Sequence, residues 1–190
     1  SEAELQNWHT EQAIAQSPPA FLTKAVTAVV REAFEKEQDD EVDGAYRAPT
    51  GSGTAVGLAV HSVMQTLDLC SPNDLDSLCL AHAEAQGIPD KVERVKRMVA
   101  NALSSPTIKL AARSDSWRET FCSANIGGVW VEAFIDLVFR NESGKLEVVD
   151  YKTGSVASEA DADAKMDRYR LQAYGYALML KDVLGEVPEK

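Results

Sequence analysis

The first half of the chain contains apolar residues that recur at intervals of three and four. Over residues 20–37 this spacing predicts an amphipathic helix. The same spacing predicts three further helices, from about Thr54 to the stretch CSPND, from Pro72 to about Gln86, and over residues 90–104. We therefore expect a helical N-terminal region over residues 1–49 and more helices after it.

The pattern changes after about residue 106, where runs rich in β-branched and aromatic residues alternate with turn signals. Four strands are predicted, with the sequences TIKLAAR, WRETFCSA, GVWVEAFIDLVFR and KLEVVDYKT. Turn signals lie at Asn125–Gly128 and Asn141–Gly144, so the last two strands are expected to form an antiparallel hairpin. A final helix is predicted over about 160–182. This order of elements predicts an α/β or α+β domain with one mixed sheet.

Length and composition narrow the class of protein. A chain of 190 residues suits one domain, and no apolar run is long enough to span a membrane. The start, SEAELQNWHT, is polar and acidic, so we expect no signal peptide. It also lacks an initiator Met, so we expect a fragment of a longer protein. Three cysteines without a CxxC spacing indicate reduced thiols in a cytoplasmic protein, rather than disulfides or a zinc site.

The formal net charge of −11 argues, taken alone, against a protein that binds nucleic acid, because phosphate contacts require Lys and Arg. The acidic residues are unevenly distributed, however. Many lie in EKEQDDEVD and SEADAD, which are typical of solvated loops. Net charge governs solubility and long-range steering, and it leaves open what a local cleft can bind.

Two of the predicted strands carry charged residues in apolar surroundings. Asp136 lies in AFIDLVF, and Asp150 and Lys152 lie in LEVVDYK, where the period of a strand places them on one face. If the strands pair through the turn NESG, the two carboxylates lie side by side and need a cation such as Mg²⁺ or Mn²⁺. The alternative is a surface hairpin in which these residues form an ordinary cross-strand ion pair.

The segments FIDLVFR, GKLEVVDYKTG and YRLQAYGYAL resemble, at this spacing, the RecB-family branch of the PD-(D/E)XK nucleases. They are most similar to the nuclease domains at the C-terminal end of RecB and AddA helicase–nucleases, and the resemblance covers roughly residues 50–180. It implies a restriction-endonuclease-like fold, with a mixed central sheet flanked by helices. The whole chain would then be one nuclease domain, with its core over residues 50–182 and a helical region before it.

The resemblance also implies a set of site residues. The metal ligands would be His61, Asp136, Asp150 and the backbone carbonyl of Tyr151. Lys152 would position or activate the attacking water and offset charge on the scissile phosphate. Glu119, in the sequence ETF, matches a glutamate that often precedes the sheet in this family, but the match is weaker. His61 could instead be a packed helix histidine.

The final helix would supply further functional residues. Gln172 and Tyr176, four residues apart, match the family's Q-x-x-x-Y motif and would face the site. Tyr169, Lys165 and Arg168 would bind the substrate. The alternatives are that the tyrosines only pack the helix on the sheet and that the cations are only solvated.

The function implied is that of a metal-dependent DNA exonuclease domain. It would use Mg²⁺ or Mn²⁺, and no iron–sulfur cluster is expected, because no cysteine follows Lys152. The substrate would be single-stranded DNA delivered by helicase domains or a partner helicase–nuclease subunit, during repair of double-strand breaks in a bacterial cytoplasm. The alternative is a catalytically silent nuclease-fold module for DNA binding or scaffolding. A free-standing endonuclease or resolvase is disfavoured by the Gln-Tyr helix and the acidic charge.

Overall fold

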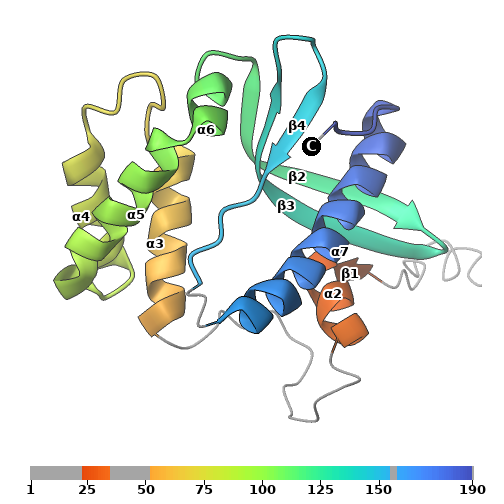
Figure 1. The fold of residues 1–190 in the computed structure, drawn as a ribbon, viewed down its shortest axis with the longest axis horizontal. Coiled ribbons are helices and arrows are strands. Elements are labelled where there is room, and N and C mark those ends of the chain that lie inside the picture. The colour runs from red at the N-terminus through yellow and green to blue at the C-terminus, as the bar shows by residue number, and fades with distance from the viewer. Residues whose placement is uncertain (1–22, 35–51, 155–157, 190) are drawn as a thin grey trace, which may run out of the picture.

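The computed structural model describes residues 23–34, 52–154 and 158–189, and these form a four-stranded mixed sheet between two groups of helices (Figure 1). The strands are β1 Thr23–Ala25, β2 Ser116–Ile126, β3 Val129–Arg140 and β4 Leu146–Val149. The α-helices are α2 Val26–Phe34, α3 Ser52–Thr66, α4 Leu75–Ala85, α5 Val92–Ser104, α6 Pro106–Ala111 and α7 Glu159–Leu184, and Pro89–Lys91 form a 3₁₀ turn. The expected mixed sheet flanked by helices, consistent with a restriction-endonuclease-like fold, is confirmed.

Strand β3 is the centre of the sheet. Along one edge it pairs antiparallel with β2, and its other edge pairs with β1 in parallel and with β4 antiparallel. One hydrophobic core lies between one end of β3 and the four helices α3, α4, α5 and α6. A second core lies between the sheet and the helices α2 and α7. The sheet therefore separates two layers of helices (Figure 1).

Two short segments differ from the sequence prediction. TIKLAAR was expected to be a strand, but α6 covers most of it, because Pro106 opens a helix and the buried Ile108 and Ala111 are three residues apart. The helix expected over residues 20–37 is confirmed over Val26–Phe34, but Thr23–Ala25 form a strand that pairs with β3. The rest of that expected helix, and most of the helical region predicted over residues 1–49, lie outside the described residues.

The chain leaves β4 earlier than expected. The strand ends at Val149, so Asp150 and Lys152 lie just beyond it and not within a strand. The register still places Val149 opposite Leu137, which brings Asp150 to the level of Asp136 on the neighbouring strand. The expected antiparallel hairpin of these two strands is thus confirmed.

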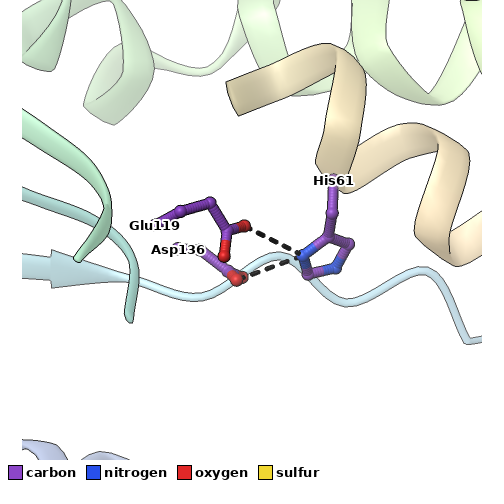
Figure 2. Close-up of side chains that lie close together, drawn as sticks. All are labelled: His61, Glu119 and Asp136. Atoms are coloured by element: carbon purple, nitrogen blue, oxygen red, sulfur yellow. Dashed lines mark hydrogen bonds and ion pairs between the residues drawn. The ribbon is translucent and has the colours of Figure 1, made fainter. Parts of the chain in front are cut away.

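The alternation of inward and outward residues in β3 changes phase at Asp136. Ile135 packs into the core under α7, but Leu137 packs into the core under α3 although it is also odd-numbered. The pairing with β2 is interrupted at the same level, at Glu119, whose φ of 47° is the one positive value among the described non-glycine residues. At this irregularity the carboxylates of Glu119 and Asp136 both point toward α3 (Figure 2).

No helix among the described residues is long and apolar enough to cross a membrane.

Candidate active site

Three side chains from three elements converge between α3 and the sheet. His61 comes from α3, Glu119 from β2 and Asp136 from β3, and one ligand atom from each lies within 4.8 Å of the others (Figure 2). His61 Nδ1 is 3.1 Å from Asp136 Oδ1 and 4.0 Å from Glu119 Oε1. We call these three residues the carboxylate–histidine cluster.

The backbone of Tyr151 fixes the orientation of this cluster. Its N–H donates to Asp136 Oδ2 at 2.5 Å, and its carbonyl lies 3.0 Å from His61 Nε2. A carbonyl can only accept a hydrogen bond, so Nε2 carries the proton and Nδ1 is the nitrogen directed at the two carboxylates. In the neutral imidazole Nδ1 would hold a lone pair, as a metal ligand requires.

The charges of the cluster shift two pKa values. Burial by itself would lower the pKa of His61, but the hydrogen bond to Asp136 and the nearby negative charges outweigh it and raise that pKa. Burial raises the pKa of Glu119, and the charge of Asp136 raises it further. Without a metal, the cluster therefore favours an imidazolium between two carboxyl groups.

Asp150 has a different set of partners. Its carboxylate forms an ion pair with Lys152 and accepts hydrogen bonds from Gln172 Nε2 and the Tyr176 hydroxyl, both at 3.3 Å. Burial raises the pKa of Asp150, and the charge of Lys152 opposes that change. Burial also raises the pKa of Tyr176 far above its usual range, so its hydroxyl remains a donor.

Lys152 is held by three neighbouring side chains. In addition to Asp150, its Nζ donates to Gln172 Oε1 at 2.8 Å and lies 5.0 Å from the centroid of the Tyr169 ring. Gln172 Nε2 donates in turn to the Tyr176 hydroxyl at 2.5 Å. The ammonium group is thus fixed in position largely by side chains of α7, and such preorganisation is what electrostatic stabilisation of a reacting group needs.

The Asp150–Lys152 pair can be reached from outside. Both residues line two open hollows, one of about 620 Å³ toward α5 and α6 and one of about 460 Å³ against α7. The second also includes Tyr169 and Gln172. A ligand could therefore approach the pair along either side of the segment that follows β4.

The predicted site residues fall into two adjoining groups. His61 and Asp136 lie in the carboxylate–histidine cluster, whereas Asp150 and Lys152 lie with Gln172 and Tyr176. The carbonyl of Tyr151, predicted as a ligand, is here the acceptor for His61. Lys165 and Arg168 lie on α7, on the turns before Tyr169. Their predicted contact with substrate stays a prediction.

Glu119 completes the cluster, although the sequence prediction gave it little weight and did not make it a ligand. A usable signal was present. The turn at Asn125–Gly128 sets the register of β2 on β3, with Ile126 opposite Val129. Counting back along both strands from that pair places Glu119 opposite Asp136. Whether Asp150 joins this cluster around a cation stays a prediction.

The donor set of the cluster fits a divalent metal ion. Two carboxylates and one imidazole nitrogen are the oxygen and nitrogen ligands that Mn²⁺ binds, and oxygen ligands also suit Mg²⁺. Two buried or half-buried carboxylates this close together also need a positive charge between them. The residues present therefore fit the expected metal, with Glu119 added to the predicted ligands.

Comparison with known proteins identifies the family. A search of curated proteins finds no significant match to the chain. A family model described as the PD-(D/E)XK nuclease superfamily matches residues 12–190, a range that contains both groups of site residues. The chain therefore belongs to the PD-(D/E)XK nuclease superfamily.

Proposed function

We propose that this chain is a metal-dependent exonuclease domain that hydrolyses phosphodiester bonds of single-stranded DNA. The observation that carries the proposal is the carboxylate–histidine cluster, with the fixed ammonium group of Lys152 beside it. This arrangement can hold a cation and a phosphate together. Membership of a nuclease superfamily supports nucleic acid as the substrate.

Each residue of the site would have a separate role. His61, Glu119 and Asp136 would hold the cation, with Asp150 next to them. When bound, a divalent cation supplies positive charge to a phosphodiester and lowers the pKa of water. The two carboxylates would also repel a negatively charged phosphate on their own side of the cation. The phosphate would therefore approach the cation from the side of Lys152.

Lys152 would stabilise charge that develops on the phosphate and orient the attacking water. Its position supports this role, because Gln172 and Tyr169 hold the ammonium group while it still lines both hollows. Gln172 and Tyr176 would act through Lys152 and Asp150, as positioning residues.

A helicase would deliver the strand. The formal net charge of −11 gives the domain little general attraction for DNA, so a motor domain or partner subunit would supply affinity and direction. Tyr169, Lys165 and Arg168 would then guide the strand along α7. A role in the repair of double-strand breaks belongs to this same proposal.

The test is cleavage of end-labelled single-stranded DNA with Mg²⁺ or Mn²⁺. The wild type is compared with Asp136→Ala, Asp150→Ala and Lys152→Ala, and with the matched controls Glu142→Ala and Lys145→Ala in an exposed turn away from the site. We expect cleavage by the wild type and both controls, and loss of cleavage in the three site variants.

Two further results would change the proposal. Cleavage of closed circular single-stranded DNA would show endonuclease action and remove the requirement for an end. Absence of both cleavage and Mn²⁺ binding in calorimetry would overturn the proposed active site and favour the scaffolding alternative.

A further inference from the structure

Two phenylalanines stand exposed on the sheet beside the candidate active site. Phe121 of β2 and Phe134 of β3 face each other in the strand register, with ring centroids 5.3 Å apart and an interplanar angle of 56°. Their exposed fractions are 55% and 61%, which is unusual for phenylalanines in the middle of paired strands. We call them the aromatic pair.

The aromatic pair lies on the same face of the sheet as the carboxylate–histidine cluster. Cys122 and Ile135 are buried in the core under α7, so their neighbours Phe121 and Phe134 project from the opposite face. Glu119 and Asp136 are each two residues away and point to that face as well, toward α3 (Figure 2). The rise of a strand puts the aromatic pair about 7 Å from the two carboxylates.

The helices of the described residues leave this part of the sheet uncovered. Helices α3 to α6 pack over one end of β3, and the β2–β3 hairpin extends away from them (Figure 1). The exposed fractions of the two rings agree with that placement.

The chemistry of this face restricts what can bind there. Its strand positions are Glu119, Phe121, Ser123 and Asn125 on β2 and Trp130, Glu132, Phe134 and Asp136 on β3. None of these eight described positions is a Lys or an Arg and three are acidic, so their side chains offer no positive charge to a phosphate. It can offer aromatic rings to a flat apolar partner, and every nucleobase has such a face.

We propose that the aromatic pair is a base-stacking subsite for single-stranded nucleic acid. It would hold a base next to the phosphodiester bond that binds between the cation of the cluster and Lys152. This inference rests on the proposed function and extends it. A base can stack there only when it is unpaired, so the subsite would select single strands over duplex, whatever the sequence of the strand.

The test measures binding rather than cleavage. Phe121→Ala and Phe134→Ala are made in the Lys152→Ala background, in which no cleavage is expected, and binding of a fluorescent twelve-residue oligothymidylate is followed by anisotropy with Mn²⁺. Alanine substitution of a stacking residue weakens binding by about fivefold to 150-fold per base. We expect that loss in each variant, with no change in the salt dependence of binding, because no phosphate contact is removed.

Two controls make the result specific. Trp117→Ala removes an exposed aromatic side chain from the same strand but from the opposite face, since its partner Val138 lies in the core under α7. We expect it to bind like the background variant. An oligonucleotide that carries abasic sites should bind the background and the phenylalanine variants equally, because it has no base to stack.

The inference and the proposed function can fail separately. If the wild type cleaves single-stranded DNA but the phenylalanine variants bind it normally, the subsite is overturned and the nuclease stands. If the phenylalanine variants change the oligomeric state in light scattering, a second copy of the chain occupies the surface and the inference is again overturned. If neither binding nor cleavage occurs, both proposals are wrong.

Discussion

His61 has different partners on its two ring nitrogens. A backbone carbonyl fixes the proton on Nε2, and two carboxylates attract a second proton to Nδ1. The same Nδ1 is the atom that a metal ion would need. Protons and metal ions therefore compete for one position, and the hydrogen bond to Asp136 and the nearby carboxylates raise the pKa of His61 in favour of the proton.

This competition predicts how Mn²⁺ affinity depends on pH. Below the raised pKa of His61 the imidazolium must lose a proton before it can bind, so affinity should fall about tenfold for each pH unit. Above that pKa the dependence on His61 ends. Calorimetry at pH 6 and pH 8, in buffers of different ionisation enthalpy, should detect proton release at the lower pH. Equal affinity at both pH values would contradict this arrangement.

Gln172 joins the two charged residues next to the cluster. It accepts from Lys152 and donates toward Asp150 and Tyr176, so Gln172→Ala should release both charged side chains. We expect kcat to fall about 10-fold to 100-fold, as is typical when a supporting partner is removed. Tyr176→Phe removes one donor to Asp150 and should have a smaller effect. Unchanged Mn²⁺ affinity in both variants would confirm that they act on Lys152 and Asp150. An equal loss of kcat in Lys145→Ala, a control in the exposed turn before β4, would contradict it.

Most of the residues that meet at the site could be predicted from the sequence. Their division into two groups, the carboxylate–histidine cluster and the group around Asp150 and Lys152, could not. Asp136, Asp150 and Lys152 were evident because charges interrupt apolar strand patterns. Glu119 was less evident because only the register of β2 on β3 places it opposite Asp136, and neither composition nor periodicity reveals its left-handed backbone conformation.

At the scale of elements, long periodic segments were predicted well and short ones were not. The strands β2 and β3 and the helix α7 have enough residues for a period to be visible. Strand β1 has three residues and depends on pairing with Trp130–Glu132, more than 100 positions along the chain. Helix α6 is also short, and a short apolar run fits a strand or a helix equally well.

Helix α3 approaches the segment after β4 very closely. A Cβ atom added at Gly57 would lie 2.9 Å from Thr153 Oγ1, so the glycine permits this contact. In the wild type, Gly57→Ala should therefore displace Thr153 and the adjacent Lys152. In the Thr153→Ala background the same change should stabilise the protein by about 1 kcal/mol, through the higher helix propensity of alanine.

Urea unfolding of the four proteins in this double-mutant cycle tests the contact. The coupling should be positive, with Gly57→Ala less favourable when Thr153 is present. Additive changes in the free energy of unfolding would mean that Gly57 of α3 and Thr153 are not in close steric contact.

At the scale of the whole molecule, the site joins residues from three layers of the fold. His61 belongs to the helical layer of α3 to α6, the carboxylates belong to the sheet, and Gln172 belongs to the opposite layer. A cation bound to His61, Glu119 and Asp136 would link the first two of these layers. Metal binding should therefore stabilise the native fold as a whole.

The expected size of this stabilisation follows from mass action. At a Mn²⁺ concentration of about 100 times the Kd, the native state gains about 2.7 kcal/mol, which should raise the Tm of a chain of this size by about 5–10 °C. Differential scanning calorimetry with Mn²⁺ and with EDTA tests this. Asp136→Asn should lose the shift, whereas Glu142→Gln in an exposed turn should keep it. A shift that survives in Asp136→Asn would locate the metal elsewhere.

The position of α7 along the chain has a consequence during synthesis. A ribosome releases the segments of His61, Glu119, Asp136 and the Asp150–Lys152 pair before it releases Gln172 and Tyr176. In a nascent chain the carboxylate–histidine cluster could therefore form while Lys152 still lacked the side chains of α7 that hold its ammonium group. A domain of the proposed function would become competent to cut only after α7 had emerged and docked, so a partly synthesised chain would not damage nucleic acid.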